Sequence, residues 1–103
     1  MSEFVPVSRA VIIADRALEA ELLEAFVRLG AKGWTSVYCN GRGGNVILDD
    51  PFVEPDRSRV RIEILASKAT AEAILRHVEN PPYGLRRVIA YMDLVQASDK
   101  RKY

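Results

Sequence analysis

The first third of the chain carries a strand-like and then a helix-like pattern of apolar residues. The segment from Ser8 to Ala14 is apolar on both alternating faces, which predicts a central strand covered on both sides. Asp15 can serve as an N-cap, and apolar residues then recur at steps of three and four until Gly30, so a helix is predicted between them. The stripe of this helix comprises Leu18, Leu22, Ala25, Phe26 and Leu29.

Two further strands are predicted in the middle of the chain. The segment from Trp34 to Asn40 is rich in β-branched and aromatic residues, which favour strands. Its residues Thr35, Val37 and Cys39 share one face. From Val60 to Leu65 apolar and charged residues alternate, which predicts a strand with one apolar face.

A second helix and a fourth strand complete the predicted elements. Ser67 or Thr70 can cap a helix that Pro81 and Pro82 prevent from continuing. Its stripe comprises Ala71, Ile74, Leu75 and Val78. The segment from Arg87 to Val95 follows as a strand, with Val88, Ala90, Met92 and Leu94 on one face. The order βαββαβ is that of an α+β ferredoxin-like plait, in which both helices cover one side of a four-stranded antiparallel sheet.

The chain of 103 residues is expected to form a single domain, residues 1–103, with a tail at about 97–103. The second and third strands are joined by a long loop at about residues 41–57, where a hairpin needs only roughly two to five residues. Connections longer than about 12–15 residues are uncommon in compact domains unless they are functional or disordered. This loop therefore calls for a functional explanation.

Composition narrows the class of protein. The net charge of +1 provides no global basic field for nucleic acid, and no apolar run is long enough to cross a bilayer. The N-terminus lacks the basic and apolar regions of a secretory signal, and a single cysteine, Cys39, suits a reducing compartment as a small core residue. We expect a cytoplasmic protein that neither binds nucleic acid nor inserts into membranes.

The long loop opens with a glycine-rich sequence that suits an anion. It reads Asn40, Gly41, Arg42, Gly43, Gly44 and Asn45. Glycines let consecutive backbone N–H groups turn toward one anion, and Arg42 adds a permanently charged fork for phosphate or carboxylate. A purely conformational role for the glycines is the alternative, and the sequence matches neither a Walker loop nor a Rossmann fingerprint.

A second basic element stands at the start of the fourth strand, where Tyr83 and Gly84 precede Leu85, Arg86 and Arg87. It is either a solvated strand end or a phosphate clamp facing the glycine-rich loop, across a subunit boundary. Four further residues are expected on the sheet face away from the helices: Arg61, Glu63, Tyr91 and Asp93. That face is either solvated or covered by association with other copies.

Catalysis and metal binding find little support in the sequence. His77 is the only histidine and is expected to be exposed on its helix. One histidine and one cysteine do not make a metal site. The acidic residues Asp49, Asp50 and Glu54 are best interpreted as solvated loop charge.

The turn from Gly30 to Thr35, with the sequence Gly-Ala-Lys-Gly-Trp-Thr, and the following Asn40 to Gly43 resemble a known family. They are similar to the PII-like signalling proteins, in particular the small branch associated with carboxysomes and bicarbonate transporters. The resemblance covers most of the chain, including the long loop between the second and third strands, called the T-loop in that family. It implies a homotrimer with an adenine-nucleotide site in each cleft between subunits.

The resemblance also implies roles for individual residues. Gly33 and Thr35 would contact the adenine, Gly41, Arg42 and Gly43 the phosphates, and Gly84, Arg86 and Arg87 would contribute from the turn before the fourth strand. A small anion such as bicarbonate would bind at Gly43, Gly44 and Asn45, so that the protein signals adenylate state and inorganic carbon to a bicarbonate transporter or a carboxysome component.

Departures from the family pattern limit which ligands and functional residues can be inferred from the resemblance. The glycine- and lysine-rich turn with which nitrogen-regulatory members hold ATP is absent, and the loop has no tyrosine to be uridylylated. We therefore expect ADP or AMP as the ligand, with no obligatory metal and no catalysis. Two alternatives remain: a trimeric copper-tolerance-type plait with a structural or metal-related role, and a small plait enzyme.

Overall fold

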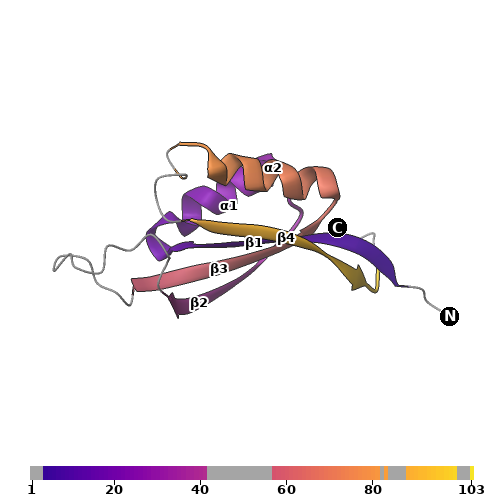
Figure 1. The fold of residues 1–103 in the computed structure, drawn as a ribbon, viewed down its shortest axis with the longest axis horizontal. Coiled ribbons are helices and arrows are strands. Elements are labelled where there is room, and N and C mark those ends of the chain that lie inside the picture. Colours follow the sequence, from indigo (N-terminus) through magenta and orange to yellow (C-terminus); the bar gives the residue numbers. More distant parts are fainter. Residues whose placement is uncertain (1–3, 42–56, 82, 84–87, 100–102) are drawn as a thin grey trace.

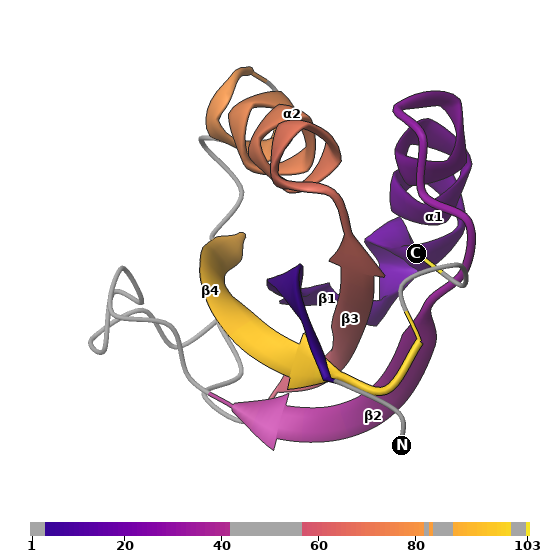
Figure 2. The ribbon, with the colours of Figure 1, turned by 90° about the vertical axis from the view of Figure 1, so that its right-hand side faces the viewer.

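The computed structural model describes residues 4–41, 57–81, 83, 88–99 and 103, with the backbone alone at residue 57. Its elements are β1 (Val5–Asp15), a 3₁₀ turn η1 (Arg16–Leu18), α1 (Glu19–Arg28), β2 (Thr35–Gly41), β3 (Arg57–Ala66), α2 (Lys68–Glu79) and β4 (Ile89–Ala97). The strands form one antiparallel sheet in the order β2-β3-β1-β4, and both helices cover the same face of it (Figures 1 and 2). The predicted α+β ferredoxin-like βαββαβ fold is confirmed.

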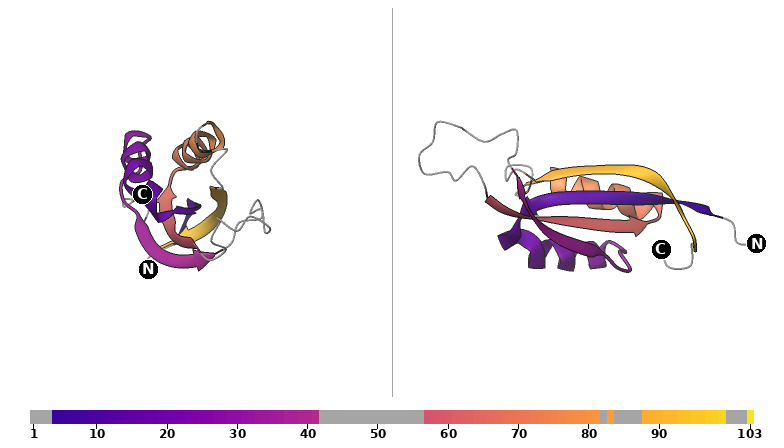
Figure 3. Two further views of the ribbon diagram at one scale, coloured as in Figure 1. Left: turned by 90° about the vertical axis from the view of Figure 1, so that its left-hand side faces the viewer. Right: turned by 90° about the horizontal axis from the view of Figure 1, so that it is seen from below.

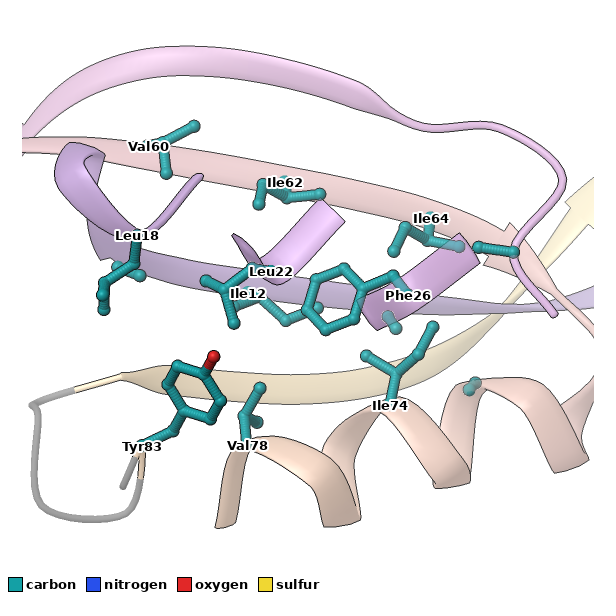
Figure 4. Packing of buried hydrophobic residues seen from close by; sticks show 14 of the residues in the cluster. Ile12, Leu18, Leu22, Phe26, Val60, Ile62, Ile64, Ile74, Val78 and Tyr83 are labelled. Atoms are coloured by element: carbon teal, nitrogen blue, oxygen red, sulfur yellow. The ribbon is translucent and has the colours of Figure 1, made fainter. Parts of the chain in front are cut away.

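The hydrophobic core lies between the sheet and the two helices. Phe26 of α1 and Ile74 of α2 point into it from the helix layer, and Ile12 and Ile62 from the sheet (Figure 4). All four side chains are fully buried. Burying a side chain of this size stabilises the fold by about 1.5–3 kcal/mol, so this cluster is the main source of stability. Strand β1 is central, as its apolar character predicts.

The predicted cap residues Asp15 and Ser67 start η1 and α2, whereas α1 follows η1 after Leu18, which makes no side-chain capping bond. The carboxylate of Asp15 accepts a hydrogen bond of 3.0 Å from the Ala17 N–H and starts η1, which leads into α1. Of the two candidates for α2, Ser67 is the cap, and its hydroxyl accepts a hydrogen bond of 3.2 Å from the Thr70 N–H.

Helix α1 ends in a Schellman motif that directs the chain toward β2. The Gly30 N–H bonds to the carbonyl of Val27 at 3.1 Å, and the Ala31 N–H bonds to that of Phe26 at 3.0 Å. Gly30 has a φ of +113°, and a Cβ there would lie 3.1 Å from Thr70 Oγ1. Glycine is therefore required at this position both by the backbone and by the neighbouring helix.

The observed strands differ from the predicted ones mainly at their ends. β1 and β4 pair from Val5 with Ala97 onward, so β4 ends two residues later than predicted. Both strands continue past the start of α2 (Figures 1 and 3). Leu94 lies on the helix-side face as predicted, yet it is 65% exposed because no helix covers that end of the sheet. In the described part of the chain, no helix is long and apolar enough to span a membrane.

Candidate functional site

The turn between α1 and β2 presents its residues to solvent. Lys32, Gly33 and Trp34 are exposed, whereas Ala31 anchors the start of the turn in the core. A Cβ built on Gly33 would meet nothing within 4 Å, and its φ is not in the left-handed region. The fold of the single chain therefore does not require glycine at this position, in contrast to Gly30.

A cavity of about 190 Å³ lies beside this turn. It is lined by Gly33, Trp34 and Thr35 of the turn, Glu63 and Leu65 of β3, and Tyr103. Thr35 pairs with Glu63 in the β2–β3 register, which places both on the sheet face away from the helices. The sequence predicts Gly33 and Thr35 at a ligand site, whereas Glu63 and Leu65 join it only through the cross-strand register, and no sequence signal indicates Tyr103.

Glu63 belongs to a charge network that crosses the outer face of the sheet. The guanidinium of Arg9 donates two hydrogen bonds to Asp93, of 2.9 Å from Nε and 2.6 Å from Nη2. Its Nη1 lies 3.6 Å from Glu63, and Arg61 Nη2 lies 3.5 Å from the same carboxylate. Strands β1, β3 and β4 are thus linked by charged side chains that are each only partly exposed.

The two hydrogen bonds from Arg9 lower the pKa of Asp93 below its ordinary value of 3.8, and the same bonds raise the pKa of Arg9. A carboxylate with a lowered pKa stabilises the folded state above its ordinary pKa and loses that contribution as the pH falls through the lowered value. The pair therefore stays ionised throughout the neutral range.

Large apolar side chains stand beside the charges on the outer face. Val37 is 51% exposed, and Ile89 and Tyr91 are also exposed, although Val11 beneath them is fully buried. The registers place Arg61, Glu63, Tyr91 and Asp93 away from the helices, which confirms that prediction. A face of this mixed character is typical of surfaces that associate with other chains.

The point where β2 ends is held by a buried arginine. Arg59 is 4% exposed, and its Nε donates a hydrogen bond of 3.1 Å to the carbonyl of Gly41. A planar guanidinium suits such a contact, because it can stay charged while donating several hydrogen bonds. Arg59 thus holds Gly41 in place at the end of β2, before the long connection. The alternating arginines at 57, 59 and 61 do not by themselves indicate this role.

Most of the predicted phosphate and anion ligands lie outside the described residues. These are Arg42, Gly43, Gly44, Asn45, Gly84, Arg86 and Arg87. On the N-terminal side of these arginines, Tyr83 is described; it is buried and donates a hydrogen bond of 2.7 Å to Glu21 of α1. The turn before β4 is therefore attached to α1 at its start.

Two sequence-based interpretations need correction. His77 is only partly exposed, because Tyr83 folds back onto it with ring centroids 5.3 Å apart. Cys39 is partly exposed on the outer face of β2, the edge strand, and is not a core residue. Among the described residues, no group of three or more His, Cys, Asp or Glu side chains is arranged to hold a metal ion.

The fold, the cavity at the turn and the long β2–β3 connection together define an α+β domain of ferredoxin-like topology with a candidate ligand site. The family model of the nitrogen regulatory protein P-II matches residues 7–96. The chain therefore belongs to the P-II family.

Solved structures of related proteins agree with this assignment. A protein of Thermus thermophilus, assigned to PII-like signalling, is 32% identical over 98% of both chains, with a TM-score of 0.79. No curated protein matches the sequence.

CPII, a nitrogen regulatory PII-like protein from Thiomonas intermedia K12, shares the fold at lower identity. Its complex with ADP and bicarbonate is 16% identical over 99% of this chain and 98% of its own, with a TM-score of 0.80. Its complex with ADP, AMP and bicarbonate is 17% identical over 99% and 97%, with a TM-score of 0.81.

Proposed function

We propose that this chain is a regulatory protein that binds ADP or AMP and does not catalyse a reaction of its own. The observation that carries the proposal is the cavity beside Gly33 and Thr35 in a chain of the P-II family. Adenine is flat and suits a cavity with an exposed aromatic ring, a hydroxyl and an aliphatic wall, which Trp34, Thr35 and Leu65 provide. The ligands of CPII support the choice of adenine nucleotides.

The remaining contacts are assigned from the sequence. Gly33 and Thr35 contact the adenine, Gly41, Arg42 and Gly43 the phosphates, and Gly84, Arg86 and Arg87 complete the clamp from a neighbouring subunit. A clamp that spans two subunits requires an oligomer, which we propose to be a homotrimer. The exposed Val37, Ile89 and Tyr91 on the outer face support association, because a free monomer gains nothing from exposing them together.

Bicarbonate is proposed as a second ligand at Gly43, Gly44 and Asn45. Together the two ligands let a cytoplasmic protein report adenylate state and inorganic carbon to a bicarbonate transporter or a carboxysome component. The presence of bicarbonate in both CPII complexes supports this pairing. For the alternative of a copper-tolerance-type protein, no feature of the described residues gives support.

Titration calorimetry with ATP, ADP, AMP and cyclic AMP tests the nucleotide proposal. We expect ADP or AMP to bind without added metal, and Gly33→Ala to weaken binding about tenfold or more, because the new Cβ enters the cavity. The melting temperature should stay within about 2 °C, since the position is open in the free chain.

Gly30→Ala is the matched control for the glycine exchange. Its positive φ makes alanine costly there, so this variant should lose about 1–3 kcal/mol of stability. Wild-type protein that binds none of the four nucleotides would refute the proposed function. Unchanged affinity in Gly33→Ala would instead remove only this turn from the site.

Bicarbonate at millimolar concentration should tighten ADP binding about fivefold or more if the two ligands bind together at neighbouring, coupled positions. Sodium chloride at the same ionic strength is the control, because ordinary screening acts equally in both salts. Calorimetric titrations of ADP in the two salts measure the difference. Equal affinities would exclude bicarbonate as a coupled ligand while leaving nucleotide binding intact.

A further inference from the structure

A second hollow, of about 390 Å³, lies at the end of the sheet where α2 begins. It is lined by Pro6, Val7 and Ser8 of β1, Ala66, Ser67 and Lys68 at the junction of β3 and α2, Leu94 of β4, and Tyr103. Among these described residues, only Tyr103 also lines the cavity at the Gly33 turn. Its lining residues place it at the end of the sheet where β1 and β4 continue past the start of α2, an end of the molecule that Figure 1 shows.

Several polar groups of this hollow can donate hydrogen bonds. Ser8 is 4% exposed, and its hydroxyl has no hydrogen-bond partner among the residues that the structure describes. The first N–H groups of α2 have no acceptor within the helix, and the Ser67 hydroxyl satisfies only that of Thr70. The N–H groups of Lys68 and Ala69 therefore remain available at the positive end of a twelve-residue helix.

The charge around the hollow favours one negative charge rather than two. Of the described residues that line it, Lys68 alone is cationic, and its Nζ lies 3.8 Å from Glu72 one turn along α2. Glu72 in turn lies 3.3 Å from Arg76, so its charge is shared between two cations. A dianionic phosphate would meet one lysine and a nearby carboxylate, whereas a single carboxylate matches the lysine, the helix end and the Ser8 hydroxyl.

The rest of the lining is apolar. Val7 and Ala66 are buried, whereas Leu94 is largely exposed and presents its side chain beside them. Tyr103 forms a further wall. Pockets with a mostly hydrophobic lining and a few convergent polar groups, in the range of about 300–1,000 Å³, are typical of small-molecule sites.

From this arrangement we infer a second ligand site, one that binds a small organic monocarboxylate with an apolar body. The carboxylate lies at the start of α2, within reach of Lys68 and the Ser8 hydroxyl, and the apolar body lies against Val7, Leu94 and Tyr103. The inference concerns binding alone and does not depend on the nucleotide site.

NMR titration of the ¹⁵N-labelled full chain with phenylacetate tests this site. We expect saturable shifts at low millimolar concentration that centre on the amides of Val7, Ser8, Lys68 and Leu94. Acetate, which lacks the apolar body, and 2-phenylethanol, which lacks the charge, should each bind at least fivefold more weakly. Equal shifts with 2-phenylethanol would contradict the anion site, and shifts absent or centred elsewhere would refute the inference.

Two variants and one control locate the contacts. Lys68→Gln and Ser8→Ala should each raise the dissociation constant of phenylacetate about threefold to tenfold. Arg76→Gln removes the same charge from the same helix and also frees Glu72, but it lies outside the hollow and should change the constant less than twofold. Equal losses in Lys68→Gln and Arg76→Gln would show a general charge effect and overturn the assignment. ADP titration of the same variants should give wild-type affinity, so failure of this site and failure of the proposed nucleotide site are distinguishable.

Discussion

Replacing Arg42 and Arg87 together with alanine should lower the affinity for ADP by about a hundredfold or more. Each guanidinium is expected to contact phosphate, and losing one charge-assisted hydrogen bond typically costs about 1.5–3 kcal/mol, or roughly ten- to a hundredfold. The two arginines come from separate segments, so their losses should combine to a large extent. Titration calorimetry of the two single variants and the double variant measures the three ADP affinities.

The matched control for this prediction is Arg28→Ala. Arg28 is exposed on α1 and pairs with Glu24 at 2.9 Å, so its removal takes away the same charge without touching the proposed clamp. Its ADP affinity should equal that of the wild type. If both single variants at Arg42 and Arg87 also keep wild-type affinity, the clamp does not exist.

Exchanging Arg9 for glutamate should convert the proposed homotrimer into monomers. The new carboxylate would stand beside Asp93 and Glu63, with which Arg9 now pairs at 2.6 and 3.6 Å. Three neighbouring negative charges on the proposed interface repel one another and need hydration, so association should fail. Light scattering at micromolar concentration should give a trimer for the wild type and the mass of one 11.5 kDa chain for Arg9→Glu.

Two further variants separate this effect from a general loss of charge. Arg76→Glu makes the same charge change on an exposed part of α2 and should remain a trimer. The exchange Arg9→Glu with Asp93→Arg restores one pair in the opposite direction and should recover part of the association. A monomeric wild-type protein would exclude both the trimer and a site shared between subunits.

The order of the elements could be predicted because each carries its own periodicity. The stripe around Phe26 and the alternation from Val60 to Leu65 are local patterns, and Asp15, Ser67 and Gly30 mark helix ends by their backbone chemistry. The ends of a strand, by contrast, depend on the neighbouring strand with which it pairs. β4 reaches Ala97 because Val5 pairs with it, and neither residue carries a local signal for that contact.

The candidate site was predictable only in part for the same reason. Gly33 and Thr35 stand in a recognisable turn, but Glu63 joins them through cross-strand pairing, and Tyr103 through a tail without periodicity. The sequence predicts His77 at the surface because a helix pattern cannot show that Tyr83 packs against it. Contacts between segments distant in sequence depend on the topology of the whole fold, and local sequence patterns carry little information about that topology.

Tyr103 forms a wall of both the cavity at the Gly33 turn and the hollow at the start of α2. A ligand that displaces Tyr103 in one of them would change the shape of the other. Thermodynamic linkage then requires reciprocity: the factor by which a carboxylate alters nucleotide affinity equals the factor by which the nucleotide alters carboxylate affinity. Tyr103 would thus provide a physical coupling between the two proposed sites.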